Sequence, residues 1–368
     1  MANGIPWVNR MVLRTSNGQG IEDIQNYNVI QRILSNFETN DYKFARSEVN
    51  GDYRANENNT VADVALKHSV GMTYIHDLQS GILGKGQQHY IPIGLFSASG
   101  GFSFELELYL EENAIATVSG NATQGSYEIS NVSLQMEIVT LPNSITDRLN
   151  QELNSENKVS IPFCTYRLHQ AYFPQSSTSV DVSISESAHD PETIYTVIRP
   201  QNLVPILNIV DTDFESRDNM SSLGGYGTPS TAYSNAVLSY QFRYDSKYYP
   251  DAKAEMAPYD SKLALFNAIH LLDLADKAVF CAGQNRTNCR WDADNTFAIV
   301  QSFKTSRDNF NNGLNSSSSG APVELVITLR APATSAMRID NFVKSNYTLN
   351  IMKGGLTSLV NGVIQNDS

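Results

Sequence analysis

Alternation of apolar and polar residues is the dominant pattern along this chain, and it predicts β-strands. The segment 102–110, FSFELELYL, is the clearest case, because Phe104, Leu106 and Leu108 share one face of an extended chain. The segment 127–141, YEISNVSLQMEIVTL, alternates in the same way from Val132 onward. Shorter or weaker segments of the same kind predict further strands at 7–14, 89–96, 115–118, 159–168, 179–185, 192–199, 236–243, 296–303, 323–329 and 347–352.

Three segments have helical spacing instead. Apolar residues recur every three or four positions across 20–38 and again across 260–276, and the spacing predicts a helix in each. The polar segment 143–157 is helix-compatible, with an apolar residue at every fourth position after Pro142. Because strands do not alternate regularly with these helices, the pattern argues against a parallel α/β sheet and favours antiparallel sandwiches.

The length of 368 residues is typical of two domains. Pro142 and the polar segment after it separate two strand-rich halves. We therefore predict an all-β fold of two tandem eight-stranded jelly-roll β-sandwiches with a few short helices. The N-terminal jelly roll is expected at 1–150 with its helix at about 20–38, and the C-terminal one at 151–368 with its helix at about 260–276.

Composition narrows the functional classes. The formal net charge is −12 and no basic arm or patch is visible, so sequence-specific nucleic-acid binding is not expected. An apolar leader and a run of 18 apolar residues are both missing, so neither a secretory signal nor a transmembrane helix is predicted. The three cysteines, Cys164, Cys281 and Cys289, are an odd number, which favours reduced thiols, although the last two bracket a short loop that a disulfide would close.

Candidate chemistry is sparse. The acidic loop 211–218 gathers oxygen ligands that suit Ca²⁺ (Asp211, Asp213, Glu215 and Asp218), but it lacks the turn glycine and terminal glutamate of an EF-hand, which favours a solvated loop. Glu105 and Glu107 share a strand face and are more typical of a wet surface than of a glycosidase pair. A Cys164–His169 pair is less favoured than a buried structural thiol. We predict no catalytic, cofactor-binding or metal site, and no enzyme.

Two other segments leave alternatives open. Tyr244, Tyr248 and Tyr249 suit an interface, where tyrosine is enriched, and suit core and loop packing equally well. The stretch 354–368 fits a contact arm that reaches a neighbour and fits a frayed tail equally well.

The order of these segments resembles the double jelly-roll major capsid proteins of tailless icosahedral DNA viruses, particularly virophages and polinton-like viruses. The likeness covers most of the chain and rests on order and texture more than on any single motif. It is carried by GIEDIQNYNVIQRIL (20–34), HYIPIGLF (89–96) with FELELYL (104–110), YEISNVSLQMEIVTLP (127–142), ETIYTVIRPQN (192–202), LSYQFRYDSKYYP (238–250), and NGLNSSSSG (312–320) followed by PVELVITLRAP. The chain is shorter than many members, which predicts small tower loops.

This resemblance implies a protein of the virion capsid that is assembled inside the host cell. Such proteins form homotrimers with pseudo-hexagonal outlines, which pack beside neighbouring capsid trimers into an icosahedral shell. Penton and minor capsid proteins would complete the shell, and an internal membrane occurs in some lineages. No catalysis is implied.

Two other classes compete with the capsid interpretation. A tandem β-sandwich carbohydrate-binding or adhesin-like module would be expected to have a secretory signal and a Trp-lined cleft, whereas the chain has two tryptophans, Trp7 and Trp291. A glycoside hydrolase or lyase on a jelly-roll scaffold would need carboxylates that converge from facing strands.

Overall fold

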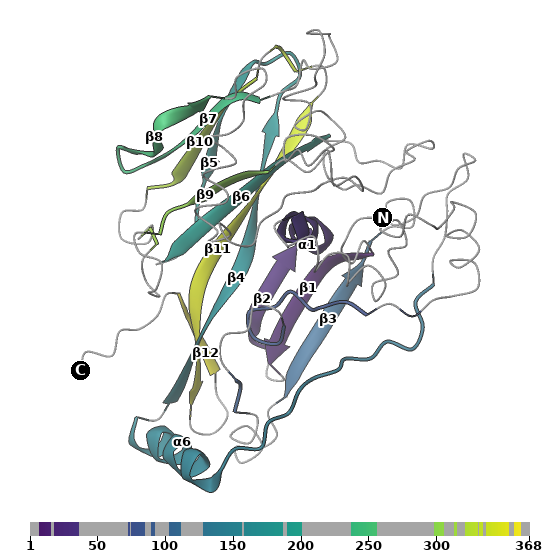
Figure 1. Cartoon of the computed structure of the whole chain (residues 1–368), viewed down its shortest axis with the longest axis vertical. Helices are drawn as coiled ribbons and strands as arrows, with labels where there is room; N and C mark the ends of the chain where they lie inside the picture. Colours follow the sequence, from purple (N-terminus) through teal and green to yellow (C-terminus); the bar gives the residue numbers. More distant parts are fainter. Residues whose placement is uncertain are drawn as a thin grey trace, which may run out of the picture.

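The computed structural model describes residues 7–15, 18–36, 73, 75–84, 90–92, 103–111, 128–156, 158–186, 190–200, 237–255, 298–304, 313–314, 321–329, 331–333, 336–352 and 357–361. Within these ranges the chain forms twelve strands and two helices (Figure 1). The strands make three antiparallel sheets, which are described in turn below.

The first sheet has three strands in the order β2-β1-β3 and is called the three-stranded sheet. Strands β1 (Val8–Thr15) and β2 (Gly20–Gln25) form a hairpin, and β3 (Phe104–Leu110) pairs with the other edge of β1. Gly18 has a positive φ of 87° in the hairpin turn, a conformation that glycine adopts without steric cost. The alternating pattern of 102–110 thus predicted β3 correctly.

The helix predicted at 20–38 is wrong in its first third. Residues 20–25 form β2, and helix α1 spans Tyr27–Asn36, beginning after Asn26 with its positive φ of 47°. The helical spacing arose because β2 is buried on both faces: Ile21 belongs to one hydrophobic cluster and Ile24 to another. A strand with two buried faces loses the period of two that identifies strands.

The second sheet, called the shared sheet, is built around β11 (Met337–Met352). Strand β4 (Lys158–Phe173) pairs with one edge of β11 over its whole length. On the other edge β6 (Pro191–Pro200) pairs with the first half of β11 and β12 (Thr357–Asn361) with the second half. Strand β9 (Ile299–Ser302) continues the sheet beyond β6.

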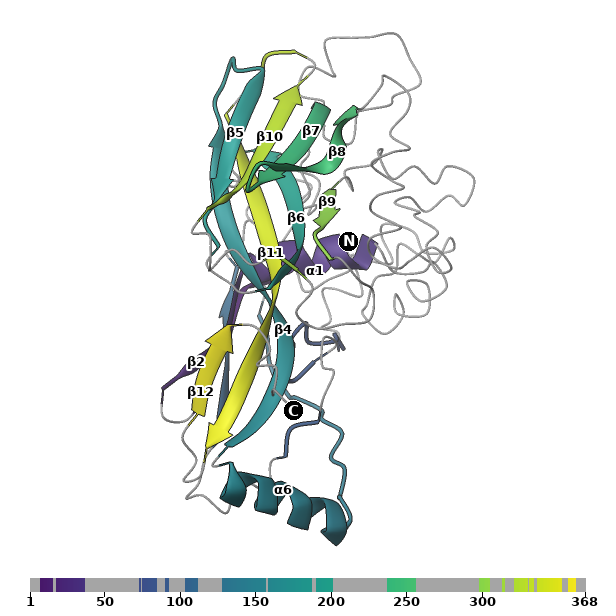
Figure 2. The same ribbon diagram turned by 90° about the vertical axis from the view of Figure 1, so that its left-hand side faces the viewer.

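The third sheet, called the outer sheet, has the order β5-β10-β7-β8. Its strands are β5 (Ser179–Ile184), β10 (Val323–Leu329), β7 (Val237–Tyr244) and β8 (Lys247–Glu255). Strand β10 buries every second residue, as its alternating sequence predicts. The outer sheet packs on the upper part of the shared sheet to form a β-sandwich (Figures 1 and 2).

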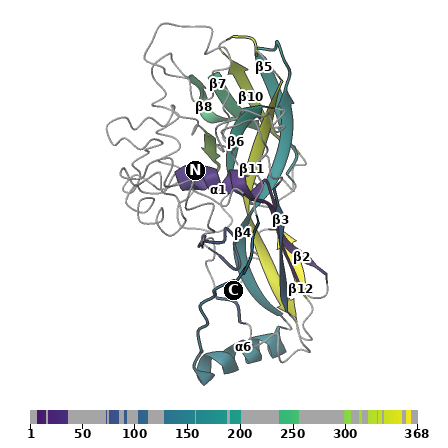
Figure 3. The ribbon, with the colours of Figure 1, turned by 90° about the vertical axis from the view of Figure 1, so that its right-hand side faces the viewer.

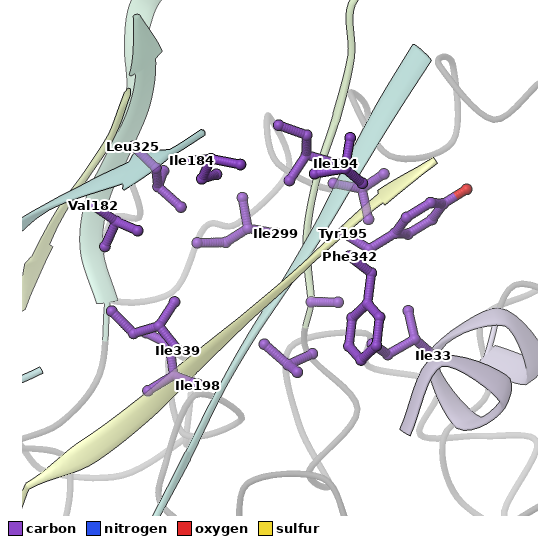
Figure 4. Close-up of a cluster of buried hydrophobic side chains, with 14 of the residues drawn as sticks. Ile33, Val182, Ile184, Ile194, Tyr195, Ile198, Ile299, Leu325, Ile339 and Phe342 are labelled. Atoms are coloured by element: carbon purple, nitrogen blue, oxygen red, sulfur yellow. The ribbon is translucent and has the colours of Figure 1, made fainter. Parts of the chain in front are cut away.

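The larger hydrophobic cluster fills this sandwich and extends to α1. Figure 4 shows Val182, Ile184 and Leu325 of the outer sheet facing Ile194, Ile198 and Ile339 of the shared sheet, with Ile33 of α1 beside Phe342. Phe342 is fully buried. Ile339 and Phe342 are three residues apart on β11 and so point to opposite faces of the shared sheet. Helix α1 therefore covers the face of this sheet that lies away from the outer sheet, with residues from the N-terminal part of the chain.

A smaller cluster lies where the lower half of the shared sheet meets the three-stranded sheet. Leu13 and Ile21 from the latter pack with Ile161 of β4 and Leu349 of β11. Strands β4 and β11 each have 16 residues and run through both clusters, as the two side views show (Figures 2 and 3). Both clusters thus contain residues from before and after position 150, and the division into 1–150 and 151–368 stays a prediction.

The segment 128–141, called the arm, differs from expectation. The alternation of its residues predicted a strand, but it forms no strand with any other described residue and leads as an extended chain into helix α6 (Asn143–Ser155) (Figure 1). Alternation supplies an apolar face, but a strand also needs a hydrogen-bonded neighbour. The helix expected at 143–157 is confirmed as α6, whereas the one expected at 260–276 lies outside the described residues.

Candidate assembly surface and buried polar network

Several candidate residues from the sequence lie outside the described residues. These are the acidic loop 211–218, Cys281 and Cys289. Of the stretch 354–368, residues 357–361 are described: they form β12 and pair with Tyr347–Ile351 of β11. That part of the stretch is therefore a strand of the protein's own shared sheet, and neither a frayed tail nor an arm.

The two glutamates of β3 are not a pair of carboxylates that converges from facing strands, as a glycosidase would need. Glu107 accepts a hydrogen bond from the Arg14 guanidinium at 2.6 Å and another from the Tyr109 hydroxyl at 2.8 Å. Glu105 is exposed and Glu107 is half-buried on the same face of β3, where Glu107 is bound by Arg14. The sequence favoured a solvated strand face here, and the structure adds the ion pair between Arg14 and Glu107.

Cys164 and His169 do not form a catalytic pair. The Cys164 thiol donates to Oδ1 of Asn346 at 2.7 Å, and burial raises the pKa of this thiol to about 11. Nε2 of His169 lies 2.8 Å from Glu186 instead. Five residues separate the two side chains along β4, so they point to opposite faces of the sheet. Cys164 is a buried structural thiol.

The tyrosine cluster divides between core and surface. Tyr244 is buried, and Tyr249 packs edge-on against Phe303 with ring centroids 5.1 Å apart. Tyr248 keeps 47% of its surface exposed. Two of the three tyrosines thus contribute to packing, and one remains on the surface.

A buried network of charged and polar side chains, called the polar network, crosses the shared sheet between β6 and β11. Glu192 is at its centre: Lys304 lies 2.9 Å from Oε1 and Lys344 lies 3.1 Å from Oε2. The Asn346 amide donates to Oε1 of Glu192 at 2.7 Å and also to Asp190. Asp190 in turn accepts a hydrogen bond from the backbone of Gly313.

The charges in this network compensate one another. The Glu192 side chain is 3% exposed, whereas those of Lys304 and Lys344 are 29% and 24% exposed. Burial alone raises the pKa of Glu192, but the two ammonium groups and the Asn346 amide outweigh it, and the pKa is lowered below 4.5. The carboxylate is therefore charged and held by two partners on β11 and one partner just after β9.

A second buried carboxylate, Glu22, links β2 to the loop that contains Ser80 and Gly81. It accepts hydrogen bonds from the Ser80 hydroxyl and, at 2.8 Å, from the Gly81 backbone. Burial raises the pKa of Glu22 despite these bonds. A Cβ added at Gly81 would lie 1.9 Å from the carbonyl oxygen of Cys164, so this loop approaches β4 more closely than any side chain allows.

These polar groups were hard to find in the sequence. Asp190, Glu192, Lys344 and Asn346 look like surface residues in a single sequence, because charged and amide residues are mostly exposed. Each is satisfied by a group that comes from elsewhere in the chain. The polar network orders the sheet and exposes no nucleophile, so its arrangement is structural.

Exposed apolar side chains gather in two places. The described chain has fifteen large apolar residues that are exposed. Seven are in the arm and at the start of α6, and three are at the end of β3. They are Ile129, Val132, Leu134, Met136, Ile138, Val139 and Ile145, and Leu108, Tyr109 and Leu110. Contiguous apolar surface of this kind marks sites of protein association.

Two other kinds of site were sought in the described residues. No group of three or more His, Cys, Asp or Glu side chains there is placed to hold a metal ion. None of the helices in those ranges has the length and apolar character needed to cross a membrane.

The strands of this chain form antiparallel sheets, and the solved structures that match it are double jelly-roll proteins. A structure described as the PBCV-1 virus capsid matches with a TM-score of 0.54 and 13% identity, over 97% of this chain and 84% of the other. A PBCV-1 structure fitted into a reconstruction of the virophage Sputnik matches with a TM-score of 0.51 and 13% identity, over the same shares.

The chain therefore has the all-β double jelly-roll fold that the sequence predicted, and the solved structures it resembles are capsid proteins of DNA viruses. The Faustovirus major capsid protein also matches, with a TM-score of 0.48 and 11% identity over 94% of this chain and 72% of that one. No family model matches the sequence, and no curated protein matches it.

Proposed function

We propose that this protein is a major capsid protein, located in the virion, whose trimers tile an icosahedral shell. The double jelly-roll fold along 97% of the chain carries the proposal. Two jelly rolls per chain give six in a trimer (3 × 2), which produces a pseudo-hexagonal outline. Such a trimer packs against identical trimers on all sides.

The described structure supports a structural role rather than a catalytic one. Its buried acids are all engaged by neighbouring groups inside the protein; within the described residues they are Glu22, Glu186, Asp190, Glu192 and Asp340. The exposed features are apolar residues of the arm and of β3, which suit contacts between proteins. Neighbouring trimers, penton and minor capsid proteins, and in some lineages an internal membrane, are the partners we propose.

The test is the mass of the purified protein in solution, with negative-stain images of the same fractions. The chain has a mass of 40.7 kDa, so a trimer has 3 × 40.7, or about 122 kDa. We expect this mass and particles with a hexagonal outline, and shells on concentration. A stable monomer at every concentration would overturn the proposal, and a glycan array would then test the carbohydrate-binding alternative.

A further inference from the structure

We propose that the arm of one copy adds as a strand to the outer edge of β3, along residues 105–110, in a second copy, and that this exchange holds the copies together. The inference rests on the proposed self-assembly and adds the surface through which it occurs. The donor is residues 128–141, and the acceptor is the outer edge of the three-stranded sheet.

The arm has the properties of a strand that lacks a neighbour. Every residue from 128 to 140 is exposed, including Val132 at 75% and Ile138 at 77%. Its backbone makes no hydrogen bond to any other described residue. An extended chain places Val132, Leu134, Met136 and Ile138 on one face, which forms an apolar row on the order of 20 Å long. Water solvates this row unless another surface covers it.

The sequence of the arm carries few of the features that protect natural strands from pairing with other chains. Its charged residues are Glu128 and Glu137, and it contains no lysine, arginine or proline. Lysine and proline are the residues that usually protect exposed strand edges. Strand β8, by contrast, carries Lys247, Pro250 and Lys253 on the edge of the outer sheet. The arm therefore has the composition of a strand that can pair with another chain, whereas β8 has the composition of a protected edge strand.

The acceptor edge has the matching chemistry. Strand β3 ends the three-stranded sheet on the side away from β1, and the apolar face of β3 becomes progressively exposed along its length. Leu106 packs against the smaller hydrophobic cluster, whereas Leu108 and Leu110 are 37% and 55% exposed. A strand laid beside β3 with its apolar row on this face would cover Leu108 and Leu110 and extend the core.

Charge excludes one register for antiparallel pairing, and matching of the apolar residues on the two strands favours another. If Leu134 lies opposite Leu106, then Gln135 lies opposite Glu105 and Ser133 lies opposite Glu107. A shift of two residues would instead place Glu137 opposite Glu105, and directly opposed like charges destabilise a sheet. The favoured register puts Val132 opposite Leu108, which gives a contact that can be tested.

A second copy is the partner that fits these observations. Leu149 and Leu153 of α6 pack on Val159 of β4 and fix the end of the arm to the protein's own body, while the arm itself stands clear of the sheets (Figures 1 and 3). Each chain carries one donor and one acceptor on different surfaces. Such a head-to-tail contact closes into a ring when the rotation between copies permits it, and a trimer needs a three-fold rotation.

Disulfide trapping between differently tagged copies tests the exchange. One copy carries Leu108→Cys and the other carries Val132→Cys, both with Cys281→Ser and Cys289→Ser. The two are expressed together and oxidised. We expect a disulfide-linked pair that contains both tags, and less of it when the second copy carries Ser133→Cys, whose side chain points to the other face. The matched control replaces Leu108→Cys by Tyr172→Cys, an exposed residue of β4, and should give no pair.

The same cysteines in one chain identify the competing arrangement. If the Leu108→Cys and Val132→Cys double variant closes a disulfide within a single chain, and the mixed copies give no linked pair, then the arm pairs with its own β3 and the inference is overturned. Linked pairs between the two tags cannot arise from pairing within one chain.

A second variant separates this inference from the proposed function. The Met136→Asp and Ile138→Asp double variant places two charges on the apolar row, and we expect the trimer to dissociate at a protein concentration at least about tenfold higher than the wild type. Tyr172→Asp is the control for an added surface charge. Unchanged trimers would overturn the arm exchange and leave the capsid proposal standing, whereas a wild type that is monomeric at all concentrations would overturn both.

Discussion

The substitution Lys344→Met tests whether the polar network stabilises the fold. Methionine keeps most of the apolar stem of lysine and removes the charge that lies 3.1 Å from Glu192. With an effective dielectric constant of about 20, a pair at this distance has a Coulomb energy of about 5 kcal/mol before the cost of desolvation. Glu192 keeps Lys304 and Asn346, so part of the loss is compensated. We expect the free energy of unfolding to fall by about 3 kcal/mol, at the lower end for breaking a buried ion pair.

The assay is urea unfolding at neutral pH, followed by fluorescence, with Arg243→Met as the matched control. Arg243 pairs with Glu324 on the surface, where solvent screens the charges, so the control should change stability little. The slope of free energy against urea should stay the same in both variants. If Lys344→Met costs no more than Arg243→Met, the buried network does not stabilise the protein as argued here.

The pH dependence gives an independent check. The folded protein lowers the pKa of Glu192, so the stability that this group contributes is present above the ordinary carboxyl value of 4.5 and is lost as the pH falls through the lowered folded value. Removing Lys344 reduces that lowering. The difference in stability between wild type and variant should therefore be full at neutral pH and narrow in acid. A constant difference across this range would contradict the electrostatic explanation.

Three further predictions concern burial and close packing. Glu22→Gln should stabilise the protein increasingly as the pH rises above 4.5, because burial raises the folded pKa of Glu22 and the charged form then opposes folding. Urea unfolding between pH 4 and 8 measures this, and a difference in unfolding free energy between variant and wild type that does not change with pH would contradict it. Gly81→Ala should lower the free energy of unfolding by roughly 1–3 kcal/mol, since the new Cβ meets the Cys164 carbonyl, and the exposed Gly20→Ala is the control, with no atom within 4 Å of its Cβ. Phe342→Ala should cost about 3–5 kcal/mol, and a loss below 1 kcal/mol in thermal unfolding would show that the side chain is not in the core.

The sequence predicted strands well where one face is buried. β10 has this character and alternates visibly, and β3 alternates as clearly although its apolar face is covered only at Phe104 and Leu106. Helix α6 was also recognised, because its apolar residues keep a period of four after Pro142. In these elements local pattern and tertiary environment agree, which is why a single sequence was sufficient.

The sequence was less informative where burial involves two faces or polar groups. Strand β2 looked helical because both of its faces are covered. The part of β11 before residue 347 was not identified as a strand, since Asp340, Asn341 and Asn346 are polar yet fully buried. Their partners come from residues as far as 182 positions away in the chain, as in the bond from the Cys164 thiol to Oδ1 of Asn346. No local pattern encodes such a partner.

The arm is the converse case, because its local pattern was clear but its pairing partner was not. Its alternation was clear, but alternation does not specify which chain supplies the neighbouring strand. The exposed apolar residues of the candidate surface could therefore be identified only after the fold showed which predicted strands had found a place in a sheet.

The position of β11 late in the sequence has a consequence for synthesis. This strand contributes to both hydrophobic clusters, yet its residues 337–352 are made after every other described strand except β12. During translation β1, β2 and β3 can pair early, but β4 supplies only part of the cover for their apolar face, and the rest is missing until β11 is made. Neither hydrophobic cluster can be completed before β11 has been synthesised. The nascent chain therefore exposes the apolar surface of incomplete sheets for a long interval. Chaperones that bind exposed apolar strands would act during that interval, and a slow final folding step would follow release.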